Sequence, residues 1–403
     1  MKKVLVLLYI NGTKNPMLKL YIEALKKNGN YKILIVSLDG VDDNLHTSIS
    51  VKALSNRFIS YINKGVSFMY STVASLFTYR KYSWRQHYDS SYYFLRHIAQ
   101  IIQSLIYCFT FKPGLIICID AAATNAARMY KKFSKVPYVY AIYEIYPDQA
   151  IRSHNSILRK LRIGIERYGV CKSSLLFSPI SEVIGKFVNR RYKTNKPVCA
   201  VSICPELLAK QSTTEIELPL KLYYHGLFID GRCLDSLIES MRHINPHEAQ
   251  LYLRGFGPLE KTLINIVKEN NLADKVTFLP PAPPDILSQL ATEYDIGLTM
   301  GDTTILNNRM ACGFKTLDNI NAGLALLVPD GYVLNQLVTK YDIGKIYKTG
   351  QAVDIAMCIQ SFVNDIDQVK QYKINSRELS REYLNKENQI NIFLNEIGHL
   401  INN

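Results

Sequence analysis

The sequence predicts an α/β protein made of two Rossmann-like, doubly wound domains. Short apolar runs alternate with helix-length amphipathic segments in both halves of the chain, which is the pattern of parallel βαβ units. The chain has 403 residues, a length that favours two domains of about 150–200 residues over one core. A polar stretch without periodicity, AKQSTTEIELP at residues 209–219, separates the two halves.

The first half opens with a buried strand. Residues 4–10 are apolar and follow Lys2 and Lys3, as in a signal peptide, but no small-residue cleavage site comes after them. The other strands are predicted from short apolar runs, and the helices from the amphipathic segments between them. The predicted strands are 3–10, 32–37, 115–119, 138–142 and 175–178. The predicted helices are 16–28, 91–109, 121–132, 155–171 and 181–190.

The second half repeats this alternation and ends in a long helix. Its predicted strands are 221–225, 250–254, 276–279, 296–300 and 324–329, and its predicted helices are 233–241, 259–270, 284–292 and 313–323. A polar helix at 369–401, with a break near Asn375 and Ser376, is expected to finish the chain.

These elements set the expected domain boundaries. We expect an N-terminal domain at 1–208, a linker at 209–220 and a C-terminal domain at 221–370. The remaining residues, 371–403, form a helical tail that could pack back on the N-terminal domain.

The composition is that of a soluble globular protein. Apolar residues make up 48% and charged residues 20%, and no apolar run reaches the roughly 18 residues that a transmembrane helix needs. The eight cysteines show no C-x-x-C spacing. Free buried thiols in a reducing cytoplasm are therefore expected, rather than disulfides or a zinc site.

The net charge of +14 is divided unevenly along the chain. Residues 1–210 carry 31 Lys and Arg against 11 Asp and Glu, whereas residues 211–403 carry 17 against 23. A basic first half indicates an anionic partner, which could be nucleic acid, an anionic membrane surface or a phosphorylated substrate, although a soluble basic surface gives the same count.

Glycines follow several of the predicted strands. Gly12 follows the first strand, and in the second half Gly226, Gly255 and Gly301 come directly after strand ends. Ligands of open parallel sheets bind beyond the carboxyl ends of the strands, so we expect a site where these loops converge.

The segment 313–323, GFKTLDNINAG, is a short predicted helix that leads into a buried strand. Lys315 and Asp318 share one face of its first turn, where free backbone N–H groups also point. Lysine and N–H groups suit a phosphate, and a carboxylate can accept hydrogen bonds from sugar or ribose hydroxyls. An ordinary helix with an i, i+3 ion pair explains the same residues.

Two arginines stand near the same predicted edge. Arg232 lies in the loop after the first strand of the second half, and Arg254 lies at the end of the next strand. Both guanidinium groups could converge with Lys315 on a diphosphate. His225 could line this site too, although a structural hydrogen bond is its commoner role.

The second half resembles the donor domain of GT-B glycosyltransferases, in particular the retaining group called family 4 that builds bacterial polysaccharides and lipopolysaccharides. The resemblance is carried by segment 313–323, by GFGP at 255–258 and by YDIGL at 294–298. It implies two Rossmann-like domains that face each other across a cleft, a nucleotide-sugar donor and transfer with retention.

The resemblance also implies roles for single residues. Lys315 would contact the donor diphosphate, Asp318 would replace the family's ribose-binding glutamate, and Arg232 would be the basic residue of the first loop, beside Gly226. The chain departs from the family at Met310, where another glutamate is usual, and at Leu227, where an arginine is usual. No Asp-x-Asp motif stands in a strand context, so we expect no metal and no cofactor, with Lys and Arg holding the leaving diphosphate.

The acceptor side is predicted in the first half. Glu144 follows a strand, where its carboxylate could orient or deprotonate an acceptor hydroxyl, although a helix cap or ion pair is an equal alternative. Gly12 and Thr13 follow the first strand and are expected on the same side. Asp120 and Glu166 are weaker candidates, and Glu166 is expected to pair with an arginine.

The composition of residues 57–112 indicates which kind of anionic partner the basic half would bind. The segment YRKYSWRQHY at 79–88 interleaves aromatic rings with cations, which favours a lipid headgroup layer. Stacking on single-stranded nucleic acid and plain packing on the sheet are alternatives. With a donor-like second domain, we expect membrane contact and no nucleic-acid partner.

The function predicted from the sequence is transfer of a sugar from a nucleotide-sugar to a lipid-linked or growing surface polysaccharide such as capsule or O-antigen. The acceptor would be carried on a lipid diphosphate, and the enzyme would be peripheral on the cytoplasmic face of the plasma membrane. One alternative is a nucleotide-sugar epimerase of the same fold. The other is a catalytically silent membrane- or nucleic-acid-binding module on a GT-B scaffold.

Overall fold

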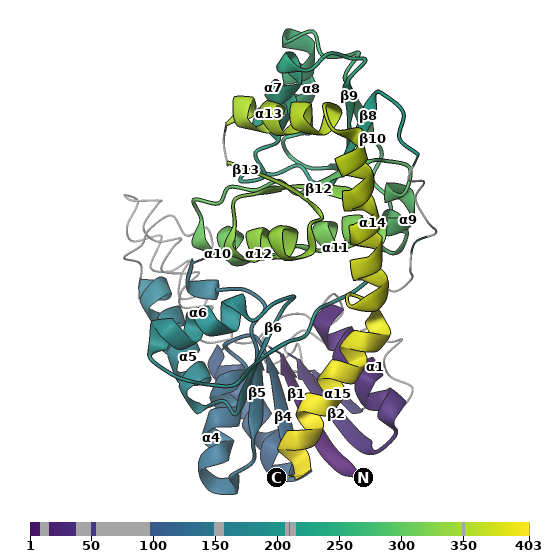
Figure 1. Cartoon of the computed structure of the whole chain (residues 1–403). Helices are drawn as coiled ribbons and strands as arrows, with labels where there is room; N and C mark the ends of the chain where they lie inside the picture. The colour runs from purple at the N-terminus through teal and green to yellow at the C-terminus, as the bar shows by residue number, and fades with distance from the viewer. Residues whose placement is uncertain are drawn as a thin grey trace, which may run out of the picture. The chain divides into compact units, whose positions relative to one another are not determined.

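The chain folds into two compact α/β units, as the sequence predicts (Figure 1). The computed structural model describes residues 1–8, 16–37, 50–53, 97–148, 157–205, 209, 215–348 and 351–402. The first unit comprises residues 1–147, 151–201 and 390–403, and the second comprises 148–150 and 202–389. The chain thus passes between units at residues 201–202, upstream of the linker expected at 209–220.

The first unit is built on a seven-stranded sheet in which all neighbouring strands are parallel. Its order is β3-β2-β1-β4-β5-β6-β7. The strands are β1 (Lys2–Leu8), β2 (Tyr31–Ser37), β3 (Ser50–Ala53), β4 (Leu115–Ile119), β5 (Tyr138–Ala141), β6 (Leu175–Ser178) and β7 (Val198–Ala200). Continuous runs of Val, Ile and Leu, as in β1 and β4, form strands that helices bury on both faces.

Helices connect these parallel strands. They are α1 (Pro16–Asn28), residues 97–111, α4 (Thr124–Ser134), the 3₁₀ turn η3 (Tyr146–Asp148), α5 (Ile157–Lys172) and α6 (Val183–Tyr192). The last helix, α15 (Lys386–Asn402), contributes Phe393 to the core of this unit, where its ring stacks on Tyr21 with centroids 4.6 Å apart.

The second unit has a six-stranded parallel sheet of order β10-β9-β8-β11-β12-β13. Its strands are β8 (Leu220–Leu227), β9 (Ala249–Phe256), β10 (Val276–Leu279), β11 (Ile296–Leu298), β12 (Ala325–Pro329) and β13 (Gly344–Tyr347). Side chains alternate across β8: Tyr224 belongs to the larger apolar core, whereas Tyr223 packs in a separate cluster with Tyr294.

The helices of the second unit lie between and after these strands. They are α7 (Leu234–Ser240), η4 (Met241–His243), α8 (Glu260–Glu269), η5 (Pro284–Ile286), α9 (Leu287–Ala291), α10 (Leu306–Met310), α11 (Phe314–Asn321), α12 (Tyr332–Tyr341), α13 (Ala352–Val363) and α14 (Ile366–Glu382).

The break expected near Asn375 and Ser376 is wrong. Both residues lie inside α14, where Ser376 is fully buried and the Asn375 amide donates to the Asp342 carbonyl at 2.7 Å. The helix stops after Glu382 instead, and the Asn385 side chain accepts from the Asn388 N–H at 2.8 Å to begin α15. Tertiary partners therefore hold the polar pair in a helix that local preference would interrupt.

Both sheets reverse their strand order once, at β1/β4 in the first unit and at β8/β11 in the second. In doubly wound sheets, ligands bind outside the carboxyl ends of strands at this reversal. In the part of the chain that the structure describes, no helix is both long and apolar enough to cross a membrane.

Candidate functional site

All five residues predicted to bind the donor lie in the second unit, around the carboxyl edge of its sheet. Gly226 is in the last residues of β8, Arg254 is near the end of β9, and Arg232 lies between β8 and α7. Lys315 and Asp318 are on α11, which follows Gly313. Segments far apart in the sequence thus meet beside the reversal of strand order.

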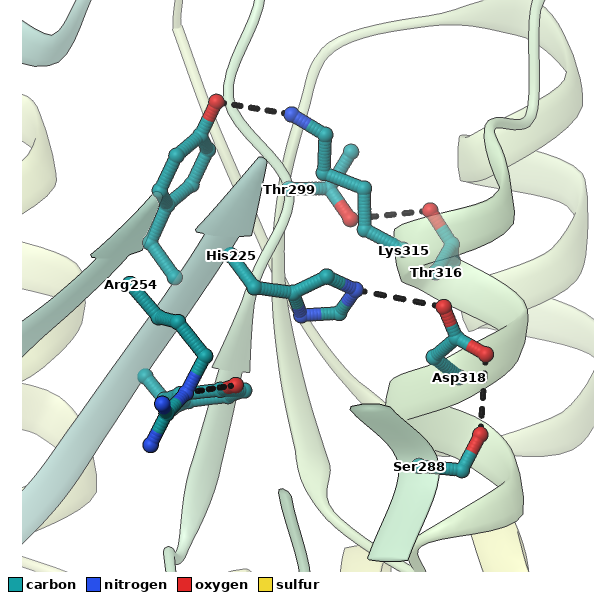
Figure 2. A network of polar contacts seen from close by, with 9 residues as sticks. His225, Arg254, Ser288, Thr299, Lys315, Thr316 and Asp318 are labelled. Atoms are coloured by element: carbon teal, nitrogen blue, oxygen red, sulfur yellow. Dashed lines mark hydrogen bonds and ion pairs between the residues drawn. The ribbon is translucent and has the colours of Figure 1, made fainter. Parts of the chain in front are cut away.

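Lys315 points to the end of β8. Its Nζ donates to the Tyr224 hydroxyl at 2.7 Å and stands 4.3 Å from the centroid of that ring (Figure 2). Asp318 binds other partners, so the simple i, i+3 ion pair does not form. Burial, and next to it the Arg232 guanidinium, hold the pKa of Lys315 well below its ordinary value.

Glycine is required where the ends of β8 and β9 meet. Gly226 has φ +137°, and a Cβ there would lie 2.8 Å from the Lys315 Nζ. Its partner in the register, Gly255, has φ +153°, and a Cβ there would lie 1.9 Å from the Gly226 carbonyl oxygen. The two glycines therefore keep the strand ends open for the lysine and for a ligand.

Lys315 and Arg232 form a pair of cations without a counter-ion. Among the described residues, neither side chain has a carboxylate within ion-pair distance, and Lys315 has only the neutral Tyr224 hydroxyl as a hydrogen-bond partner. Partly buried cations are normally paired, because removing a charge from water is costly. This edge of the sheet is therefore suited to an anion that approaches from solvent.

The loops after β8 and β11 are tied together beside these cations. The Asp302 N–H donates to the Gly231 carbonyl at 2.9 Å, which fixes the backbone next to Arg232. The Asp302 carboxylate in turn accepts from the Thr304 N–H at 2.8 Å and from its hydroxyl at 2.6 Å. The loop that carries Arg232 is thus held by the neighbouring loop across the reversal of strand order.

Asp318 holds a buried histidine. One carboxylate oxygen lies 3.2 Å from Nε2 of His225, and the other accepts from the Ser288 hydroxyl at 2.8 Å (Figure 2). His225 is 3% exposed, and its Nδ1 has no hydrogen-bond partner among the described residues. Both carboxylate oxygens keep lone pairs for further donors, so a ribose hydroxyl can still be accepted.

Arg254 lies apart from the two other cations. It is the register neighbour of His225 on β9, where its Nε donates to the Tyr223 hydroxyl at 3.0 Å (Figure 2). Its Nη1 donates to the Pro280 carbonyl at 2.9 Å. The structure thus brings Lys315 and Arg232 together as expected, whereas Arg254 braces the loop after β10.

The two departures from the family pattern have different surroundings. Met310 is buried at the end of α10, so an apolar side chain fills that position within the fold. Leu227, by contrast, is the exposed last residue of β8. Neither side chain supplies charge to the site.

The acceptor-side predictions fall in the first unit. Glu144 is half-buried three residues after β5, which places it beyond the carboxyl end of that strand. Gly12 and Thr13, and the segment 79–88, lie outside the described residues. Asp120 directly follows β4 and is buried with φ +71°.

Glu166 has the structural environment expected for it. Its fully buried carboxylate accepts from the Tyr192 hydroxyl at 2.5 Å, and the Arg191 guanidinium lies 3.9 Å away. Arg191 belongs to α6, whereas Glu166 lies on α5.

Two site residues were not predicted from the sequence. Tyr224 contacts Lys315, and the alternation of side chains along β8 could have placed it on the same face as Gly226. Ser288 binds Asp318 from α9, a contact across 30 residues that no local pattern indicates. Within the described ranges, no group of three or more His, Cys, Asp or Glu side chains has the arrangement to hold a metal ion.

Comparisons with known proteins identify the architecture. No protein-family model matches the sequence, and no curated protein matches it by sequence either. Solved structures match over the full length. Sucrose-phosphate synthase from Thermosynechococcus elongatus aligns over 100% of both chains at 12% identity, with a TM-score of 0.66.

Two further structures show the same similarity. Anabaena HepE in complex with UDP aligns over 99% of this chain and 100% of its own, at 11% identity and a TM-score of 0.70. The lipopolysaccharide outer core galactosyltransferase WaaB aligns over 99% of both chains, at 13% identity and a TM-score of 0.62. The protein therefore has the two-domain GT-B fold of these glycosyltransferases.

Proposed function

We propose that the protein is a glycosyltransferase that uses a nucleotide-sugar donor, bound at the carboxyl edge of the second sheet. The observation that carries this proposal is the pair of cations, Lys315 and Arg232, which has no carboxylate partner among the described residues and stands beside Gly226 at the strand reversal. A nucleoside diphosphate supplies the missing negative charge.

The resemblance of the fold supports the same donor class. HepE structures hold UDP, UDP with glucose, or UDP-glucose, and a TarM structure from S. aureus holds UDP with glycan ligands. By analogy, the diphosphate of the donor would lie against Lys315, Arg232 and the start of α11, and Asp318 would accept from ribose hydroxyls beside His225.

In the proposed reaction, the bond between the sugar C1 and the diphosphate oxygen breaks, and C1 forms a bond to an acceptor hydroxyl oxygen. The hydroxyl proton passes to the Glu144 carboxylate, and the nucleoside diphosphate leaves with the electron pair. Lys315 and Arg232 stabilise the charge that develops on the diphosphate. Glu144 orients the acceptor hydroxyl, and retention at C1 follows the family resemblance. No divalent metal is assigned a role, so turnover is expected to survive chelation by EDTA.

The acceptor is proposed to be a lipid-linked or growing surface polysaccharide. The basic first half of the chain supports a peripheral position on an anionic membrane, at its cytoplasmic face. A lipid diphosphate carrier would add negative charge to the acceptor itself.

A turnover assay tests the proposal. Purified protein is incubated with a panel of UDP-, GDP-, ADP- and CMP-sugars, with and without membrane extract, and released nucleotide is measured. Lys315→Ala and Arg232→Ala should each lower turnover at least about a hundredfold, as expected when a buried charge contact to the transition state is lost. Lys345→Ala, which removes a half-buried lysine that binds Ser361, should leave turnover unchanged.

The same assay separates the alternatives. Conversion of a nucleotide-sugar to its epimer without acceptor would establish an epimerase. Absence of both turnover and nucleotide binding would favour the silent module, which the apolar Met310 and Leu227 positions would then explain.

A further inference from the structure

Helix 97–111 in the first unit has its apolar side facing outward. Its exposed positions are Ile98, Ile102, Ile106 and Phe109, which recur every three or four residues and so form one stripe. The side that packs on the protein holds three buried polar residues, His97, Gln100 and Ser104, and only two small apolar ones, Ala99 and Cys108. This is the reverse of the usual arrangement, in which an amphipathic helix buries its apolar face.

The stripe continues onto α4. The Phe109 ring meets Tyr130 edge-on at 5.1 Å and lies 6.2 Å from Phe133. At the other end, the Asn125 amide is 2.8 Å from Nε2 of His97, so the two helices lie side by side along their length. Phe133 is 76% exposed, and Ile102 and Ile106 are each 55% exposed. These side chains form a continuous apolar surface, which we call the isoleucine face.

The charges around the isoleucine face are almost all positive. Between residues 97 and 135 the only acidic residue is Asp120, which is buried, whereas Lys112, Lys132 and Lys135 are exposed near the Phe109 and Phe133 end. On the adjoining helix α5, the exposed Tyr168 ring carries the Arg128 guanidinium 4.8 Å above its centroid. Aromatic rings and lysines at the border of an apolar stripe match a layer of lipid headgroups.

We propose that the isoleucine face is a docking surface for an anionic lipid bilayer. The isoleucines and Phe133 would enter the boundary between headgroups and acyl chains, and the lysines would contact the anionic headgroups. A second copy of this chain is disfavoured as the occupant, because a two-fold contact would bring lysine borders of like charge together. The inference gives a location to the membrane contact of the proposed function and rests on that part of it.

Vesicle flotation tests this surface with the full-length chain. Vesicles are made of phosphatidylcholine alone, or of equal parts phosphatidylcholine and phosphatidylglycerol. The wild type should float with the anionic vesicles and bind the neutral ones much more weakly. The double variant Ile102→Gln, Ile106→Gln should bind the anionic vesicles at least about tenfold more weakly, because it removes apolar side chains that would enter the bilayer.

Matched variants separate the apolar and charged contributions. Val353→Gln with Met357→Gln removes two comparably exposed apolar side chains from α13 in the second unit, and should not change binding. Lys132→Gln with Lys135→Gln should reduce binding to anionic vesicles and its sensitivity to salt, with little effect on neutral vesicles.

Three results would overturn the proposal. The wild type could fail to bind anionic vesicles, or the isoleucine variant could bind them as tightly as the wild type. The isoleucine variant could also turn a wild-type dimer into a monomer in sedimentation while vesicle binding persists, which would make this face a contact between copies. A thermal-shift measurement with nucleotide-sugars tests donor binding separately. If the wild type binds vesicles through this face but binds no nucleotide-sugar, the proposed reaction is refuted and the docking surface is not.

Discussion

Lys315 brings its ammonium group to a place where its closest partner is the neutral hydroxyl of Tyr224. Burial and the Arg232 guanidinium both make its charged form less favourable, and so lower its pKa in the ligand-free protein. An anion at this position reverses that preference. The residue is therefore poorly arranged for stability of the empty protein and well arranged for a ligand that carries negative charge.

Nucleotide binding should be coupled to proton uptake at Lys315. The bound diphosphate raises the pKa of Lys315 from its lowered value, so affinity should fall as the pH rises from the lowered pKa towards the bound pKa. Calorimetry in buffers of different ionisation enthalpy should show protons taken up by the wild type. Lys315→Met should remove this uptake, and equal uptake in both proteins would contradict the assignment.

The Lys315 ammonium group should also make the ligand-free protein less stable at low pH. Because the pKa of Lys315 is lower in the folded than in the unfolded protein, the folded state loses stability as pH falls from the unfolded pKa towards the lowered folded pKa, and loses no more below it. Lys315→Met should therefore melt at a higher temperature than the wild type, with a difference that grows towards lower pH. A lower melting temperature at every pH would show that the Tyr224 contact matters more than the charge.

Asp318 should matter for both folding and ligand binding. Asp318→Asn weakens the contact to Nε2 of His225 and leaves polar groups of this buried network poorly paired, so it should cost about 1–3 kcal/mol in the free energy of unfolding. It should also weaken nucleotide binding, which titration would measure. Ser288→Ala is the control, since it removes a hydrogen bond to the same carboxylate from the side of α9 and should affect stability only.

At the scale of elements, the paired ends of β8 and β9 shape the site. Gly255→Ala would place a Cβ against the Gly226 carbonyl oxygen and force alanine to a positive φ. It should therefore lower the free energy of unfolding of the second unit by at least about 2 kcal/mol. Gly226→Ala meets the flexible end of Lys315 instead. It should cost less stability and more nucleotide affinity, as denaturant unfolding and titration would show. The opposite ranking would contradict this view of the strand ends.

Helix α14 is tied to the sheet by a buried ion pair. The Lys373 ammonium, which is fully buried, donates to Asp295 at 3.0 Å and to the Tyr294 carbonyl at 3.2 Å. Lys373→Met leaves the Asp295 carboxylate without its cation and should cost about 3–5 kcal/mol, as chemical unfolding would measure. The exposed pair Lys370–Asp367 on the same helix is the control, and Lys370→Met should leave stability almost unchanged.

The sequence predicts some of these elements better than others. Strands such as β4, β6 and β10 are predicted to the residue, because a short apolar run is followed at once by a residue that ends a strand: Asp120 after β4, Pro179 after β6 and Pro280 after β10. β3, β7 and β13 escape prediction: a lysine interrupts the apolar residues of β3 and of β13, and β7 has only three residues. The contacts of Asp318 escape for another reason: His225 lies 93 residues away, and only the strand order brings it close.

For the whole molecule, the two-domain α/β architecture follows from the alternation of apolar runs and amphipathic helices, and the structure confirms it. The orientation of single side chains does not follow in the same way. Arg254 and Arg232 both come after strands of one sheet, yet the first braces the Pro280 loop and only the second lies beside Lys315. The sequence predicts a helix at 91–109, which the structure describes from residue 97 to 111. That its apolar side faces outward can be recognised only from the exposure of each residue in the structure.

Donor binding measured by titration calorimetry tests the central claim most directly. A panel of nucleotide-sugars is titrated into the wild type, Lys315→Ala and Lys345→Ala. At least one donor should bind the wild type and Lys345→Ala alike, and should bind Lys315→Ala about 30-fold more weakly or worse, as expected when a buried charge pair loses one partner. If no donor binds the wild type, or if Lys315→Ala binds it equally well, the second unit is not the donor site described here.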